Sequence, residues 1–137
     1  AKQAHPAYFE HDFNACPDLV QTCAVTLCAL GIPFHLTGTT TLMVKETDRI
    51  AALLSELKQL GYVLTADPNG AWMAWDGDRC DPVADPVVQT YHDHRMAMAF
   101  APLAIVRGEI SIGDPGVVSK SYPGYWEDLQ KAGFGVA

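Results

Sequence analysis

The apolar positions of this chain follow two different periods, which together predict a mixture of helices and strands. In four segments apolar residues recur every three or four positions, as they do in helices with one buried face. These segments cover 17–30, 47–60, 93–106 and 123–132. A glycine follows each of them, and glycine suits the left-handed residue that ends many helices. Pro102 lies inside the third segment and predicts a kink there.

Shorter apolar runs between these segments predict strands. They cover 32–36, 40–44, 62–65, 71–75, 86–90 and 109–112. The turn Asp67-Pro68-Asn69-Gly70 is a strong hairpin signal, whereas the charged stretch 76–85 predicts a loop. The order is helix, two strands, helix, three strands, helix, strand, helix. Two helix-plus-strands blocks follow one another, so we expect an α/β or α+β domain with a loosely repeated unit.

Composition excludes several classes of function. The 137 residues suffice for about one domain, and 49% hydrophobic with 18% charged residues is a globular balance. Nine basic and 16 acidic residues give a net charge of −7, which disfavours binding to nucleic acid or to an anionic membrane. Neither a membrane-spanning run nor a signal-peptide pattern occurs, so we expect a cytoplasmic protein. The cysteines lack zinc-site spacing, and we predict no metal site.

The positive charges occupy informative places. Of the nine cations, Lys45, Arg49, Arg95 and Lys120 stand where a predicted helix begins or a strand ends. Helix starts that gather at one edge of a sheet commonly bind anions. Arginine fits a carboxylate with two parallel hydrogen bonds, whereas lysine meets phosphate as a compact charge. Each cation alone could be a surface charge, but the four together favour a shared anion site.

Groups able to transfer protons lie in the same places. Asp18 falls in the first turn of the first helix, where a carboxylate could simply stabilise the helix dipole. Glu46 stands between Lys45 and Arg49 and could carry a proton in a charge-balanced setting. His94 adjoins Arg95. These residues make general acid–base chemistry beside the anion site a hypothesis.

At these residues the chain resembles a known family, the 5-enolpyruvylshikimate-3-phosphate (EPSP) synthases, also called 3-phosphoshikimate 1-carboxyvinyltransferases. The resemblance extends from about residue 12 to 134 and covers the C-terminal part of the family's sequence. Its motifs are Val44-Lys45-Glu46-Thr47-Asp48-Arg49, Asp93-His94-Arg95-Met96-Ala97-Met98, Pro17-Asp18, and the stretch 114–123 with Lys120. Two multi-residue motifs in the correct order make the resemblance specific.

The resemblance implies a transferase of the shikimate pathway to chorismate and the aromatic amino acids, in the family that the herbicide glyphosate targets. Such enzymes move the enolpyruvyl group of phosphoenolpyruvate to the 5-hydroxyl of shikimate 3-phosphate, release phosphate, and need no cofactor. The implied catalytic residues are Asp18, as the base, and Glu46, in proton transfer. The implied contacts to shikimate 3-phosphate are Asp18, Thr41 and Lys45, and those to phosphoenolpyruvate are Arg49, His94, Arg95 and Lys120. Thr41 replaces an asparagine that is common in the family, which weakens the expectation for that contact.

The resemblance also implies an inside-out α/β barrel domain, in which repeated β-α-β-α-β-β units place their helices inward. We expect residues 1–137 to be the C-terminal portion of the C-terminal domain, with about two units. The chain begins at Ala1 rather than at methionine, and the family's N-terminal domain has no counterpart in it. The isolated chain is therefore expected to be inactive, because the active site lies between two domains.

Two other functions stay open at this point. The sister enzyme acting on UDP-N-acetylglucosamine shares the fold and the chemistry, although the motif 93–98 favours shikimate. A noncatalytic α/β module that keeps an anion pocket would show the same charges at helix starts.

Overall fold

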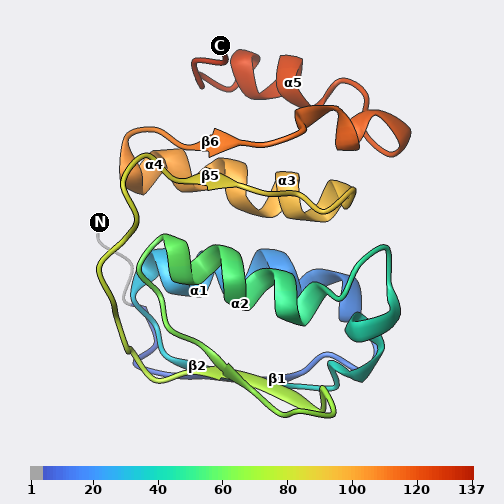
Figure 1. Ribbon diagram of the computed structural model, residues 1–137, viewed down its shortest axis with the longest axis vertical. Helices are drawn as coiled ribbons and strands as arrows, with labels where there is room; N and C mark the ends of the chain where they lie inside the picture. The colour runs from blue at the N-terminus through green and yellow to red at the C-terminus, as the bar shows by residue number, and fades with distance from the viewer. Residues whose placement is uncertain (1–4) are drawn as a thin grey trace.

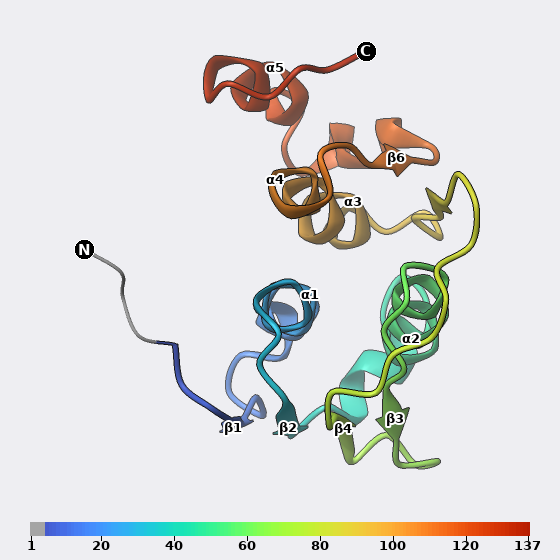
Figure 2. The same ribbon diagram turned by 90° about the vertical axis from the view of Figure 1, so that its left-hand side faces the viewer.

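The computed structural model describes residues 5–137 and arranges them in layers, with the two longest helices inside and the C-terminal helix at the far edge (Figure 1). A four-stranded sheet forms one outer layer, and helices α1 (Val20–Leu30) and α2 (Arg49–Gln59) cover its inner face. Helix α3 (His94–Phe100) packs on α1 from the side away from the sheet, as Figure 2 shows. The central helices therefore stand between the sheet and the C-terminal elements, which agrees with the expected inside-out arrangement.

The outer sheet has the order β1-β2-β4-β3. Its strands are β1 (Phe9–Asp12), β2 (Phe34–Thr37), β3 (Thr65–Ala66) and β4 (Trp72–Trp75). Strands β1 and β2 run parallel, whereas β2–β4 and β3–β4 are antiparallel. Along β2 and β4 every second side chain is buried, namely Phe34, Leu36, Met73 and Trp75. This alternation places one face of the sheet against the helices.

Each of the first two predicted helices forms with ends close to the predicted ones. A short 3-10 helix, η1 (Pro17–Leu19), leads into α1, and Gly31 adopts a left-handed φ of 72° after its last residue. Helix α2 begins inside the charged segment, since Asp48 caps it by accepting a hydrogen bond from the Ala51 amide at 3.0 Å. The predicted apolar stripe of α2 is buried at Ile50, Leu53 and Leu57.

The third predicted helix breaks at Pro102, as expected for a proline in a helix interior. It divides into α3, the 3-10 helix η3 (Ala101–Leu103) and α4 (Ala104–Arg107). Two short strands, β5 (Val87–Val88) and β6 (Ser111–Ile112), flank this helical stretch in sequence and pair in parallel. Helix α5 (Tyr125–Lys131) follows near the C-terminus.

The strand predicted at 40–44 is wrong. These residues form a 3-10 helix, η2 (Thr40–Val44), which buries Leu42. Strand β2 already pairs with β1 and β4 on its two sides, so no edge remains beside it for a further strand. Gly38 makes the sharp turn with a φ of 70°, where a Cβ atom would overlap the carboxylate of Asp12 and the backbone of Asn14. The chain thus leaves the sheet at this glycine and reaches the start of α2.

The other departures concern the ends of the chain and the lengths of strands. The pattern did not predict β1 or the 3-10 helix η4 (Pro115–Lys120). The runs at 62–65, 86–90 and 109–112 form only two-residue strands in or beside the predicted ranges. The hairpin between β3 and β4 is confirmed, with the Gly70 amide donating to the Asp67 carbonyl at 2.9 Å.

Without the 3-10 helices, β1 to β4 follow the order β-α-β-α-β-β. The elements β5 to α5 then repeat a β-α pattern, with its helix broken at Pro102. No helix within residues 5–137 is long and apolar enough to cross a membrane.

Candidate active site

Three helical segments begin on the same side of the molecule, to the right in Figure 1. They are η1 with α1, then α2, and then α3. The hydrogen bonds that Asp18 of η1 accepts from α2 and α3 join residues 31 and 77 positions apart in the sequence. The contacts join Asp18 of η1, Arg49 of α2, and Asp93 and Arg95 at the start of α3. The expected gathering of charges at helix starts is therefore real for this side of the fold.

Arg49 is the centre of the cluster. Its side chain is only 1% exposed and is bound by three carboxylates. Nε donates to Asp93 Oδ2 at 2.8 Å, Nη1 donates to Asp18 Oδ1 at 2.9 Å, and Nη2 donates to Glu46 Oε2. A buried cation is tolerated only when it is paired and hydrogen-bonded in this way. Arg49 therefore depends on all three neighbours.

Asp93 is the buried partner of Arg49. It is fully buried, caps α3 and accepts a hydrogen bond from the Arg95 amide at 2.9 Å. The two residues before it, Tyr91 and His92, have positive φ angles of 54° and 57°, which non-glycine residues rarely adopt. The backbone is thus turned tightly to direct the Asp93 carboxylate at Arg49.

A second buried carboxylate fixes the segment that leads to Asp93. Glu56 of α2 is 4% exposed and accepts hydrogen bonds from the Gln89 amide at 2.8 Å and the Tyr91 hydroxyl at 2.6 Å. Thr90 is buried as well, and its hydroxyl donates to the Gly113 carbonyl at 2.9 Å. These contacts keep the strained turn in place.

Asp18 lies at the open edge of the cluster, with a side chain that is 46% exposed. Lys45 Nζ is 3.8 Å and Arg95 Nη2 is 3.5 Å from its two oxygens. Partial burial by itself would raise the pKa of Asp18, but the charges of Arg95 and Lys45 and the hydrogen bond from Arg49 outweigh it. The pKa of Asp18 therefore lies below its ordinary value of 3.8.

The structure brings five of the eight predicted site residues into contact. They are Asp18, Lys45, Glu46, Arg49 and Arg95. Lys120 is exposed at the end of η4, which packs against α3, and it forms no ion pair with a described residue. His94 is half-buried in the first turn of α3, and Thr41 is exposed on η2. Within residues 5–137 none of these three side chains forms a hydrogen bond or an ion pair with the cluster, although His94 stands between Asp93 and Arg95 in the chain.

Comparisons with known proteins identify the family of the chain. The sequence model of the family described as EPSP synthase (3-phosphoshikimate 1-carboxyvinyltransferase) matches residues 2–129. The chain belongs to the EPSP synthase family.

Relatives named 3-phosphoshikimate 1-carboxyvinyltransferase show how the chain matches this family. That of Bacteroides fragilis strain YCH46 is 57% identical over 127 residues, which are 93% of this chain and 31% of the relative. That of Methanoculleus marisnigri is 36% identical over 90% of this chain and 28% of its own length. A solved EPSP synthase structure from Acinetobacter baumannii aligns with a TM-score of 0.64 at 28% identity, covering 85% of this chain and 27% of that one. The chain thus spans less than a third of these relatives.

Two buried residues of the charge cluster are not among the predicted site residues. Asp93 belongs to the motif 93–98 but carries no predicted role, and Gln21 lies inside the predicted helix 17–30. Gln21 is 1% exposed, and its Nε2 donates to Asp93 Oδ2 at 3.2 Å. A capping aspartate directly before a basic pair could have indicated Asp93, whereas no sequence signal separates Gln21 from an exposed glutamine.

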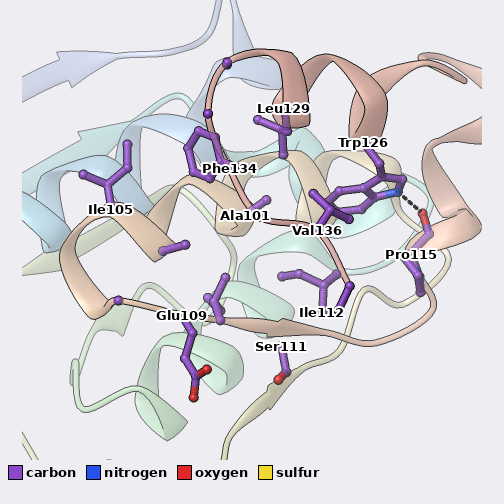
Figure 3. A pocket seen from close by; sticks show the side chains of 17 residues that line it. Ala101, Ile105, Glu109, Ser111, Ile112, Pro115, Trp126, Leu129, Phe134 and Val136 are labelled. Carbon is purple, nitrogen blue, oxygen red and sulfur yellow. Dashed lines mark hydrogen bonds between the residues drawn. The ribbon is translucent and has the colours of Figure 1, made fainter.

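A large groove elsewhere in the chain does not fit an anionic ligand. It encloses about 850 Å³ between α4, β6, α5 and the C-terminal residues (Figure 3). Apolar side chains such as Ile105, Ile112 and Leu129 line it, Trp126 donates to the Pro115 carbonyl at 2.9 Å, and Glu109 is its charged side chain. Among residues 5–137 no group of His, Cys, Asp or Glu is arranged to hold a metal ion. The charge cluster is therefore the better candidate for the functional site.

Proposed function

We propose that this chain supplies one half of an active site that transfers the enolpyruvyl group of phosphoenolpyruvate to the 5-hydroxyl of shikimate 3-phosphate, with release of phosphate. The observation that carries the proposal is the contact of Arg49, Arg95 and Lys45 with two carboxylates at the common edge of three helix starts. Fixed cations next to proton-transfer groups suit a reaction between two anionic substrates.

The cations divide between the two ends of phosphoenolpyruvate. Arg95 and Arg49 bind its carboxylate, and Lys120 binds its phosphate, with His94 beside them. Arg95 is the accessible guanidinium, since its side chain is 34% exposed and faces Asp18. The donors of Arg49 are engaged by carboxylates, so a substrate carboxylate reaches it by taking the place of Asp18 or Glu46. Binding is thus an exchange of anions around a fixed cation.

This exchange changes the basicity of Asp18. In the unliganded cluster three cations lower its pKa, which makes it a poor proton acceptor. A bound carboxylate or phosphate would neutralise part of that positive charge and raise the pKa of Asp18. Asp18 then accepts the proton of the attacking hydroxyl, which Lys45 and Thr41 orient. Asp18 therefore becomes an effective base when phosphoenolpyruvate is bound.

The reaction needs one further proton. Glu46 delivers it to C3 of phosphoenolpyruvate, the hydroxyl oxygen of shikimate 3-phosphate bonds to C2, and a tetrahedral intermediate results. Glu46 then takes a proton back from C3 as phosphate leaves C2, which restores the double bond, and the proton held by Asp18 leaves with the phosphate. The cations around the site stabilise the charge that develops in these steps.

The remainder of the site belongs to another domain. We propose that residues 1–137 form the C-terminal portion of the C-terminal domain and that an N-terminal domain faces it in the same protein. The chain corresponds to 31% of the Bacteroides fragilis relative, which supports this division. The cluster described above already pairs its cations with carboxylates, so the phosphate of shikimate 3-phosphate needs additional partners.

Variants of the full-length protein test the assignment. We expect Arg95→Ala and Lys120→Ala each to lower kcat/KM for phosphoenolpyruvate by about 100-fold or more, because each removes a charge that meets the reacting anion. Phosphate release from shikimate 3-phosphate and phosphoenolpyruvate is the assay, with UDP-N-acetylglucosamine as the alternative acceptor.

Lys131→Ala is the matched control. Lys131 lies on α5 with a side chain that is 77% exposed and pairs only with Asp128, one turn away. Its removal should leave kcat/KM unchanged. Wild-type kinetics in Arg95→Ala and Lys120→Ala, or turnover of the UDP sugar instead of shikimate 3-phosphate, would contradict the proposal.

A further inference from the structure

Asp93 links the two arginines of the cluster through its two oxygens. Oδ2 accepts from Arg49 Nε at 2.8 Å, and Oδ1 accepts from Arg49 Nη2 at 3.3 Å. The same Oδ1 accepts from the backbone amide of Arg95 at 2.9 Å. One carboxylate therefore sets the plane of the Arg49 guanidinium and also fixes the helix start that carries Arg95.

Gln21 holds this carboxylate from a third helix. Its Nε2 donates to Asp93 Oδ2 at 3.2 Å, and the side chain is 1% exposed on α1. An ionised carboxylate only accepts hydrogen bonds, so the orientation of the Gln21 amide is determined. Its Oε1 atom is then buried without a hydrogen-bond partner among the described residues.

The unpaired oxygen argues that Gln21 is not there for stability. A buried acceptor without a partner destabilises the fold, and an apolar side chain of similar length would avoid that cost. The amide donates its one hydrogen bond to the carboxylate that orients Arg49. A side chain that contributes a single contact at such a cost is expected to serve the site.

We infer that Gln21 is a positioning residue for the phosphoenolpyruvate carboxylate site and that it acts through Asp93. The inference rests on the proposed function. Asp93 occupies the inner edge of the Arg49 guanidinium, and Gln21 keeps Asp93 in that place. The outer edge of the Arg49 guanidinium contacts Asp18 and Glu46. With Asp93 held in place, this edge keeps a fixed orientation toward the substrate carboxylate and a fixed distance from Arg95.

Gln21→Met in the full-length protein is the first test. Methionine has a similar length and no donor, so the fold is retained while the hydrogen bond to Asp93 is lost. We expect KM for phosphoenolpyruvate to rise about tenfold, because a hydrogen bond to a charged group is removed. The values of kcat and of KM for shikimate 3-phosphate should change less than about twofold, and Tm should stay the same or rise.

Gln130→Met is the matched control, because Gln130 is exposed on α5. It should leave both KM values unchanged. The inference is overturned if Gln21→Met leaves KM for phosphoenolpyruvate unchanged, or if it raises both KM values equally with a lower Tm, as a merely structural role would.

A double-mutant cycle tests whether Gln21 acts through Asp93. In an Asp93→Ala background no acceptor remains for Gln21 Nε2, so Gln21→Met should produce no further rise in KM for phosphoenolpyruvate. Additive effects of the two substitutions would show that Gln21 acts by another route and would overturn the inference.

A measurement without substrate separates this inference from the proposed function. In the 137-residue chain, the Nε–H proton of Arg49 is buried against Asp93 and should exchange slowly in ¹⁵N-resolved spectra. We expect Gln21→Met to shift this signal and to speed its exchange, and Gln130→Met to leave it unchanged. Absence of turnover by the wild-type full-length protein would contradict the proposed function. The exchange of the Arg49 Nε–H proton would still test the role of Gln21. An unaltered signal in Gln21→Met would overturn the positioning role.

Discussion

At the scale of single residues, the cluster is a buried cation surrounded by carboxylates of unequal exposure. Asp93 is fully buried, whereas Asp18 is 46% exposed at the rim. The sequence allowed Asp18, Glu46 and Arg49 to be predicted because charges at helix starts are visible in a pattern. It did not reveal Asp93 or Gln21 as partners of Arg49, because burial of polar side chains depends on tertiary contacts between α1, α2 and α3.

The ion pairs of Asp18 predict a pH dependence of stability. Its pKa is lowered in the folded chain, so folding favours the ionised form. The stabilisation is fully present above the ordinary pKa of 3.8 and is lost as the pH falls through the lower folded value. The urea midpoint of the 137-residue chain, followed by tryptophan fluorescence, should therefore decrease in this acidic range. In Asp18→Asn the decrease should be smaller, and an equal decrease in both proteins would contradict the role of these ion pairs.

At the scale of elements, the spacing of apolar residues and the residues typical of turns predicted the helices better than the strands. The α2 boundaries follow from Asp48 and Gly61, which are visible in the sequence. The run 40–44 has strand-like residues, yet β2 is paired on both sides and the chain forms η2 instead. The pattern did not predict strand β1, because most of its residues are polar. Three of its four residues are exposed, as suits a strand at the edge of a sheet. Whether such a segment forms a strand depends on the neighbouring elements, which the local sequence pattern does not contain.

The packing of α1 predicts the reactivity of its cysteines. Cys28 is 2% exposed, and burial raises the pKa of its thiol to about 12, against an opposing effect of the Arg79 charge. Since the thiolate is the reactive form, Cys28 should remain unmodified by iodoacetamide at about pH 8 in the native chain. Half-buried Cys16 and Cys80 should react before Cys28, and all four cysteines should react in urea. Modification of Cys28 as fast as Cys80, measured by peptide mass spectrometry, would show that α1 opens readily.

At the scale of the whole molecule, the cluster lies at the open edge of three helix starts and is not enclosed. Lys45 and Arg95 each expose about a third of their side chains there, at 33% and 34%. The chain also spans less than a third of its relatives in the EPSP synthase family. An edge of this kind needs an opposing surface to exclude water and to orient two substrates.

The isolated chain should therefore be inactive. We expect no phosphate release from shikimate 3-phosphate and phosphoenolpyruvate by residues 1–137 alone, because the opposing domain that we propose would not be present to orient the substrates. The full-length protein, assayed at the same molar concentration, is the positive control. Measurable turnover by the 137-residue chain would show that the second domain is dispensable.

The distribution of the Arg49 partners along the chain also determines when the fold can close during synthesis. Glu46 is three residues away and Asp18 is 31 residues earlier, but Asp93 follows 44 residues later. At translation rates of 5–20 residues per second, Asp93 is synthesised roughly 2–9 s after Arg49. Until then, burial of this end of α2 would leave a cation only partly neutralised. Closure of this end of the helical layers is thus assigned to the α3 segment, whose arrival neutralises Arg49.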